Sequence, residues 1–337
     1  MLVDQGSVGK ETVDVRESAR HAESVGYNTF WYAETKHDPF LPLVLAAEHT
    51  ERIRLGTGIA LAFARNPMTV AAAANDLQHF SRGRLMLGLG SQIKPHIERR
   101  FSMPWSRPAA RMREFVLAMR AIWEAWNDET RLNFRGEFYS HTLMTPFFAP
   151  DPNPYGQPKV MLAGVGARMS EVVGEVADGF LGHSLTTARY LREVILPSVQ
   201  RGREKAGRTT EGFEASGQLI VITGRDEAEM QQVAETARQS LGFYLSTPAY
   251  RGMLEVFDWG DRQDELTRLS KQGEWDAMTK LVDDEMLDTF TIWAAPDGVA
   301  AKVVDRFGGL YDRVSFTPDL GVAPEVFDQI ARQLHAS

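Results

Sequence analysis

The 337-residue sequence predicts an α/β fold, a (β/α)8 or TIM barrel, on two observations. Short apolar runs alternate with amphipathic helical stretches, the pattern of consecutive βα units in a parallel sheet. Eight such runs match the strand number of that barrel. In chain order, the predicted strands are Leu2 to Asp4, Thr29 to Ala33, Arg54 to Ile59, Arg84 to Leu89, Lys159 to Ala163, Gly179 to Gly182, Glu214 to Thr223 and Asp312 to Thr317.

The stretches between these runs are predicted as helices because each carries one apolar stripe at three- and four-residue spacing. Two of them also begin at residues that are typical of helix starts, Asp226 and Pro296-Asp297. The stripes include Met112, Phe115, Met119, Ile122 and Trp126, and then Met169, Val172, Val173 and Val176.

Two segments interrupt the alternation. Residues 127–157 are rich in proline, glycine and aromatic residues and are predicted as an irregular excursion or hairpin. Residues 243–287 carry many charges in helical spacing and are predicted as a helical lid. Neither has the length or the self-contained core of a second domain, so we expect one TIM-barrel domain over residues 1–337 with these two insertions.

An open doubly wound sheet is the alternative fold, because βα alternation also supports it. That fold requires a glycine fingerprint after the first strand. Gln5-Gly6-Ser7-Val8-Gly9 matches this fingerprint only loosely, and no acidic residue at the end of the second strand is well placed to bind a ribose. The barrel is therefore favoured.

Composition narrows the functional classes. Acidic residues outnumber basic ones by 45 to 37, and the net charge of −8 disfavours nucleic acid or anionic membrane as a partner. The absence of cysteine excludes disulfides, thiolate metal sites and a cysteine nucleophile. The first residues lack the features of a secretory signal, and the longest apolar stretch, residues 68–74, is too short to cross a bilayer. We expect a cytoplasmic protein.

In a parallel barrel, functional residues follow the strands at their C-terminal ends. After the second predicted strand, Glu34, Lys36 and His37 bring a carboxylate, an amine and an imidazole to this rim. Histidine titrates near neutral pH and can move a proton or polarise a substrate oxygen. Glu34 and His37 are therefore candidate catalytic residues. The alternative is that the two charged residues are solvated and that His37 caps the next helix.

Glycine-rich turns follow the third to the sixth predicted strands. Glycine lets the backbone approach a flat ring, and consecutive N–H groups at a helix start form a cradle for phosphate. Any βα turn also uses glycine, so each turn taken alone fits a purely structural role. The candidate binding residues are Thr57, Gly58, Ile59, Gly90, Ser91, Gln92, Ala163, Gly164, Val165, Gly166, Gly182, His183 and Ser184.

A basic cluster surrounds Trp105 in this acidic chain. It can receive an acidic cofactor tail, or its members can be solvated helix charges. The sequence contains no His-Glu-x-x-His metal motif, no Gly-x-Ser-x-Gly elbow and no Walker A loop, so the simplest hydrolase functions are disfavoured. The members of the cluster are Lys94, His96, Arg99, Arg100, Arg107 and Arg111.

Taken together, these motifs resemble the luciferase-like monooxygenase superfamily over nearly the whole chain. The stretch from Gly90 to Phe101 is also similar to a subgroup of coenzyme F420-dependent oxidoreductases. The segments that carry the wider resemblance are Ala22 to Tyr27, Trp31 to Glu34 with His37, Arg54 to Ile59, Asn66-Pro67, Gly83 to Gly90 and Ala177 to Gly179.

The resemblance implies a barrel of the bacterial luciferase type that holds the deazaflavin F420 at its strand C-termini. The ring would lie against a non-prolyl cis peptide at Gly58-Ile59, and the phosphate near Gly164 to Gly166 and His183-Ser184. The implied reaction is hydride transfer at C5 of the deazaflavin to or from a small organic substrate, with His37 assisting proton movement. Glu34 and His37 match positions beside the ring, and the family implies a homodimer.

Two departures from the family pattern concern the catalytic residues. Two residues separate Glu34 from His37, whereas many relatives have the acid and the histidine adjacent. Ser91, Gln92 and Ile93 occupy a stretch where some F420-dependent relatives have a catalytic glutamate, so the resemblance assigns no general acid there. Two alternative functions stay open: an FMN-dependent monooxygenase that uses reduced flavin and oxygen, and a non-catalytic flavin-binding protein.

Overall fold

Eight parallel strands close on themselves, because β1 pairs with both β2 and β12 and β9 pairs with β10. The structure, a computed structural model, describes residues 1–7, 15–317 and 320–336. Its closed ring confirms the predicted barrel and rules out the open sheet. Val8 and Gly9 of the loose glycine fingerprint lie outside the described residues. In ring order, the strands are β1 (Leu2–Ser7), β2 (Thr29–Tyr32), β3 (Arg54–Thr57), β5 (Leu85–Gly90), β8 (Lys159–Ala163), β9 (Gly179–Gly182), β10 (Glu214–Ile222) and β12 (Arg313–Phe316).

Two short strands that the sequence did not predict extend this sheet. Strand β4 (Ala60–Leu61) pairs with β5, and β11 (Thr291–Trp293) pairs with β10. With two and three residues, they are too short to show an alternating pattern. The third predicted strand, Arg54 to Ile59, was too long, because β3 ends at Thr57. The Gly58-Ile59 peptide bond that lies just beyond β3 is cis.

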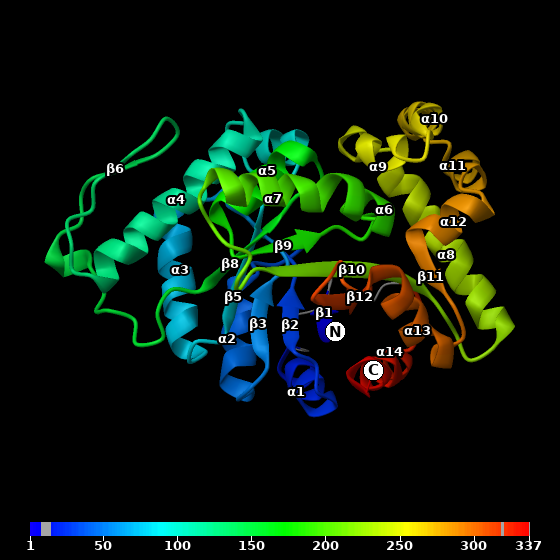
Figure 1. Ribbon diagram of the computed structural model, residues 1–337, viewed down its shortest axis with the longest axis horizontal. Coiled ribbons are helices and arrows are strands. Elements are labelled where there is room, and N and C mark those ends of the chain that lie inside the picture. Colours follow the sequence, from blue (N-terminus) through cyan, green and yellow to red (C-terminus); the bar gives the residue numbers. More distant parts are fainter. Residues whose placement is uncertain (8–14, 318–319, 337) are drawn as a thin grey trace.

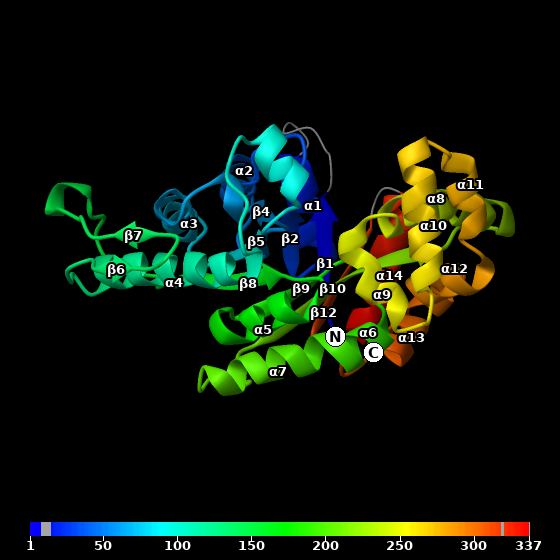
Figure 2. The same ribbon diagram turned by 90° about the horizontal axis from the view of Figure 1, so that it is seen from above.

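Helices surround the barrel wall (Figures 1 and 2). Within the described residues, none combines the length and apolar character that crossing a bilayer requires. Their bounds are α1 (Val15–Val25), α2 (Phe40–His49), α3 (Pro67–Phe80), α4 (Pro108–Asn127), α5 (Ala167–Val176), α6 (Ala188–Tyr190), α7 (Leu196–Lys205), α8 (Glu227–Leu245), α9 (Arg251–Glu255), α10 (Gly260–Gln272), α11 (Trp275–Leu281), α12 (Asp284–Phe290), α13 (Pro296–Phe307) and α14 (Pro324–Ala336).

Side-chain caps or prolines mark several of the helix starts. The Asp226 carboxylate accepts a hydrogen bond of 2.9 Å from the Glu229 N–H and so begins α8, as predicted. The Asn66 side chain accepts one of 3.0 Å from the Thr69 N–H, and Pro67 occupies the first position of α3. Pro296 begins α13 in the same way. These caps fix where each helix leaves its preceding loop.

The two interrupting segments lie at opposite ends of the long axis of the molecule (Figures 1 and 2). The first contains a small hairpin of β6 (Phe134–Arg135) and β7 (Ser140–His141). The second contains the 3₁₀ turn η6 (Pro248–Tyr250) and helices α9 to α12. Because α8 continues to Leu245, this second segment begins a few residues later than the predicted residue 243.

The barrel interior has its own small apolar cluster, separate from the large core between the strands and the helices. It consists of Trp31, Met86, Met161 and Leu181, with Ile59 and Ala163 packed against it. These side chains come from four different strands and point inward, so they fill the centre of the barrel. This cluster forms the base on which the candidate site is built.

Candidate functional site

A cavity of about 660 Å³ opens at the C-terminal ends of the barrel strands. This volume suits a small-molecule or cofactor site, and this end of a TIM barrel is where such sites are found. Residues from the strand ends, from the loops that follow and from the second insertion line it: Gly6, Trp31, Ala33, Gly58, Ile59, Gly90, Ser91, Gln92, Ile93, Lys94, Trp105, Pro108, Ala163, Gly164, Val165, Met169, Leu181, Gly182, His183, Ser216, Gln218, Tyr244, Ala249, Tyr250 and Ser315.

The floor of the cavity is apolar and closely packed. Trp31, Ile59 and Leu181 belong to the interior cluster and also line the cavity. A Cβ added at Gly56 would lie 2.2 Å from the Trp31 ring, so the backbone of β3 can pass the indole only as glycine. The Gly58-Ile59 peptide beside it is cis, as the sequence resemblance implied. The floor therefore offers an apolar surface.

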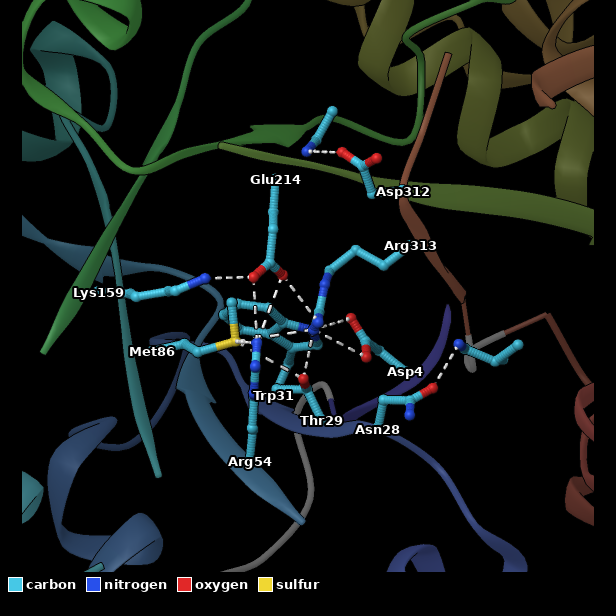
Figure 3. A network of polar contacts seen from close by, with 12 residues as sticks. Asp4, Asn28, Thr29, Trp31, Arg54, Met86, Lys159, Glu214, Asp312 and Arg313 are labelled. Carbon is cyan, nitrogen blue, oxygen red and sulfur yellow. Dashed lines mark hydrogen bonds and ion pairs between the residues drawn. The ribbon is translucent and has the colours of Figure 1, made fainter. Parts of the chain in front are cut away.

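A buried network of charges lies toward the opposite, N-terminal end of the barrel (Figure 3). Arg313 lies 3.1 Å from Asp4 and 2.9 Å from Glu214, which in turn pairs with Lys159 and Arg54. Trp31 Nε1 donates a 2.9 Å hydrogen bond to Asp4. Burial raises the pKa of Asp4, while Arg313 acts in the opposite direction. The network thus orients the indole that forms the cavity floor.

One side of the cavity is the loop between β8 and α5. Gly164 and Val165 line it, and Gly166 is the N-cap of α5 in extended conformation. The first N–H groups of a helix have no partner within the helix and carry partial positive charge. The Tyr190 hydroxyl donates a 2.9 Å hydrogen bond to the Val165 carbonyl and so ties this loop to α6. The loop therefore presents donors suited to an anion.

The structure brings most of the sequence-predicted binding residues to one cavity. Three do not line it. The Thr57 hydroxyl is buried and donates a 2.7 Å hydrogen bond to the Gly88 carbonyl. Gly166 lies just behind the lining loop, and Ser184 borders a separate void of about 10 Å³. The ten that line the cavity are Gly58, Ile59, Gly90, Ser91, Gln92, Ala163, Gly164, Val165, Gly182 and His183.

Glu34 is held by other protein groups rather than facing the cavity. One carboxylate oxygen accepts a 2.6 Å hydrogen bond from Arg65 Nη1 and one of 2.8 Å from the Leu61 N–H. Arg65 also pairs with Asp38 at 2.7 Å. This ion pair fastens the loop after β2 to the segment after β3. Glu34 therefore holds two loops of the rim together through Leu61 and Arg65.

His37 lies half-buried in the same loop, between β2 and α2, and is not among the cavity-lining residues. The Arg100 guanidinium donates a 2.7 Å hydrogen bond to the Thr35 carbonyl, so this loop contacts the turn after β5. The structure therefore places His37 at the barrel mouth, on the rim rather than in the wall of the cavity.

An aromatic cluster forms another wall of the cavity. The His183 ring lies 4.7 Å from the Tyr250 ring and 5.7 Å from the Tyr244 ring, measured between centroids. His183 Nε2 and the Tyr250 hydroxyl are 3.2 Å apart. Burial lowers the pKa of His183 to about 4, and burial followed by the proximity of Tyr244 raises the pKa of Tyr250 to about 12. Both side chains are therefore uncharged at neutral pH.

The sequence predicts residues 243–287 as a lid but does not show which of them line the cavity. Tyr244, at the end of α8, and Ala249 and Tyr250, in η6, line the cavity although they follow β10 by many residues. No local pattern fixed the path of this segment. Its aromatic residues beside a predicted lid were the only available signal.

The basic cluster around Trp105 is divided in the structure. Lys94 and Trp105 line the cavity. Arg111 is buried, donates to the Pro104 carbonyl at 2.5 Å and lies 4.6 Å from the centroid of the Phe63 ring. Arg111 thus supports the fold, and Lys94 is the cluster's cation at the cavity.

Comparison with known proteins places this geometry in context. A family model described as luciferase-like monooxygenase matches residues 3–313 of the chain. An uncharacterized protein of Mycobacterium tuberculosis is 53% identical over 309 residues, which cover 92% of this chain and 91% of that protein.

Two further relatives carry descriptive names. The 5,10-methylenetetrahydromethanopterin reductase of Archaeoglobus fulgidus is 26% identical over 290 residues, covering 84% of this chain and 82% of that protein. The solved structure of a coenzyme F420-dependent tetrahydromethanopterin reductase from Methanopyrus kandleri superposes with a TM-score of 0.78 at 19% identity, covering 98% of this chain and 97% of that one. The second likeness shows a shared fold.

Proposed function

Because the chain belongs to the luciferase-like monooxygenase family, we propose that it is a coenzyme F420-dependent oxidoreductase that transfers a hydride between the deazaflavin and a small organic substrate. One observation carries the proposal: an apolar floor and the start of α5 meet in the same cavity at the barrel mouth. A flat ring and a phosphate, joined in one molecule, need these two surfaces side by side.

The residues fit such a group. A Cβ added at Gly6, which lines the cavity, would meet nothing nearer than the Phe316 carbonyl oxygen at 4.0 Å, so the wall is open there. A Cβ added at Gly166 would have no neighbour within 4 Å. Gly58, Ile59 and Gly90 would hold the ring, and the Gly164 to Gly166 turn with the first N–H groups of α5 would hold the phosphate.

When bound, F420 supplies a two-electron hydride carrier, and the protein supplies orientation and electrostatics. Ile59 and the packed floor beneath it would support the ring, and Tyr244 and Tyr250 line the same cavity, where they would contact a substrate. Pre-organised positions of this kind lower the entropic part of the barrier. His37 on the rim would assist proton movement.

Titration of the purified full chain with F420 and, separately, with FMN tests the cofactor. We expect saturable quenching of F420 fluorescence and much weaker binding of FMN. Preference for FMN would favour the monooxygenase alternative, in which reduced flavin reacts with oxygen. Binding of neither would overturn the proposal, and tight F420 binding without turnover on any substrate would favour a binding protein.

A pair of variants at Gly166 tests the phosphate cradle. In Gly166→Asp the new carboxylate would cap α5 but repel the phosphate, so F420 affinity should fall about tenfold or more. Gly166→Asn supplies a cap of the same shape without charge. Its side chain would accept from the same N–H groups, so it should bind F420 more weakly than the parent protein but more tightly than Gly166→Asp. Equal affinities for the two variants would place the phosphate elsewhere.

His37→Ala tests the catalytic assignment on the rim. Turnover should fall far more than F420 affinity, because the imidazole would act on a proton rather than hold the cofactor. Turnover is measured in steady state and affinity by the same titration. A parallel loss of both would assign His37 to binding or to loop structure.

A further inference from the structure

We propose that Tyr250 is a substrate-binding residue whose hydroxyl, oriented by His183, donates a hydrogen bond to an uncharged carbonyl or hydroxyl oxygen of the substrate. The inference deepens the proposed function and rests on it for the identity of the cavity as a substrate site. It assigns a chemical class, an alcohol or carbonyl compound.

The hydrogen bonds of His183 fix its tautomer. The Leu185 N–H donates to Nδ1 at 3.2 Å, so Nδ1 carries no proton. A neutral imidazole has one N–H, which must then be on Nε2. Nε2 lies 3.2 Å from the Tyr250 oxygen. The imidazole is therefore the donor of this bond and the phenol oxygen is its acceptor.

This assignment leaves the proton of Tyr250 for another acceptor. The bond to His183 uses a lone pair of the phenol oxygen and not its hydrogen. Tyr250 lines the cavity, together with His183. The hydroxyl hydrogen is thus offered to an oxygen atom of whatever occupies the cavity, and accepting from His183 strengthens it as a donor.

The charge state of the pair favours a neutral acceptor. Both residues are uncharged at neutral pH, as the directions of their pKa shifts require. A charged group against this wall would lose hydration without gaining an opposite charge from the pair. A carbonyl or hydroxyl oxygen needs only the single donor that Tyr250 presents.

The position of Tyr250 is fixed relative to the proposed cofactor loop. A Cβ added at Gly252 would lie 3.1 Å from the Tyr190 hydroxyl, so the insertion packs closely on α6 at this point. The same hydroxyl donates to Val165. Tyr190 therefore connects the segment that carries Tyr250 to the loop that would hold the phosphate.

A matched pair of probes tests the donor. Acetophenone and α-methylstyrene have nearly the same shape, but only acetophenone carries an oxygen acceptor. With the full chain, ligand-observed NMR titration should give about fivefold tighter binding of acetophenone, the size of one hydrogen bond. Tyr250→Phe should abolish this preference. Tyr244→Phe, the control in the same wall, should retain it.

Variants of His183 test the positioning role. In His183→Gln the side-chain amide can still donate to Tyr250, so the preference for acetophenone should largely persist. His183→Leu removes the donor and should reduce it. In the parent protein, ¹⁵N NMR should show the proton of His183 on Nε2 at neutral pH. A proton on Nδ1 would contradict the argument.

The outcomes separate this inference from the proposed function. Equal affinity of the parent protein for both probes, no binding of either, or equal losses in Tyr250→Phe and Tyr244→Phe would overturn the donor role, even if F420 binds. A preference lost only in Tyr250→Phe, in a protein that fails to bind F420, would leave the donor in place and remove the redox function.

Discussion

The two ends of the barrel use polar groups in opposite ways. At the N-terminal end, Arg313 and Asp4 are fully buried and paired with each other, and the network extends to Glu214 (Figure 3). At the C-terminal end, the wall of the cavity consists mainly of glycines, aromatic rings and neutral polar groups such as His183, with Lys94 as a charged residue.

This difference shows how the fold separates stability from function. Charged groups that are paired with each other add rigidity but have no free hydrogen bond for a ligand. Neutral groups that still have a hydrogen to donate can bind one. Trp31 connects the two ends, since its Nε1 donates to Asp4 and its ring lines the cavity.

The largest effect is expected at the closed end. Arg313→Met would leave Asp4 and Glu214 without their shared partner in a buried position, and breaking such a pair costs about 3–5 kcal/mol of unfolding free energy. Urea unfolding measures it. The control is Arg225→Met, which breaks an exposed pair with Glu229 and should change nothing measurable. If Arg313→Met lost as little unfolding free energy as the control, the buried network would contribute little to stability.

A smaller effect is expected from the same substitution at two glycines. In Gly88→Ala the new Cβ would meet the Thr57 carbonyl oxygen at 1.9 Å, and relieving this overlap should cost up to about 3 kcal/mol. In Gly6→Ala, at the cavity mouth, the Cβ has open space, so stability should hold while the cavity narrows. Thermal or urea unfolding compares them. Equal destabilisation by the two substitutions would contradict close packing at Gly88 and open space at Gly6.

The smallest effect concerns pH at the open end. Burial lowers the pKa of His183 to about 4 from 6.5, so as the pH falls the unfolded chain takes up a proton before the folded chain does. Its contribution to stability, complete above pH 6.5, is therefore lost between pH 6.5 and about 4. We expect the free energy of unfolding to fall by about 1–2 kcal/mol between about pH 7 and pH 5. His183→Gln should lack this slope, and an unchanged slope would contradict the assignment.

The fold could be predicted from the sequence because its signals are local. Apolar runs alternating with helical stretches located all eight barrel strands. Asp226 marked the start of α8 as its cap, and Pro296 marked the start of α13 as its first residue. Strands β4 and β11 were not predicted, because they form by pairing with a neighbouring strand and have no pattern of their own. The βα periodicity therefore carried more information than the propensity of any short segment.

The site could be predicted only where it consists of strand ends. Gly58, Gly90 and Gly164 line the cavity because the barrel topology brings all strand C-termini together. The partners of Glu34 were not foreseeable, since Arg65 lies 31 residues further along the chain. Tyr250 was missed for a related reason. A long connection can return to the barrel at many places, and only tertiary packing selects one.

The second insertion supplies one wall of the cavity from a segment outside the barrel strands and the other βα loops. Evolution can therefore exchange this wall by replacing the residues between β10 and β11, while the apolar floor and the α5 turn stay intact. Relatives with the same barrel are free to diverge in substrate choice by drift in a single stretch of chain. A chimera that carries this stretch from another family member should take on the ligand selectivity of the protein from which the stretch came.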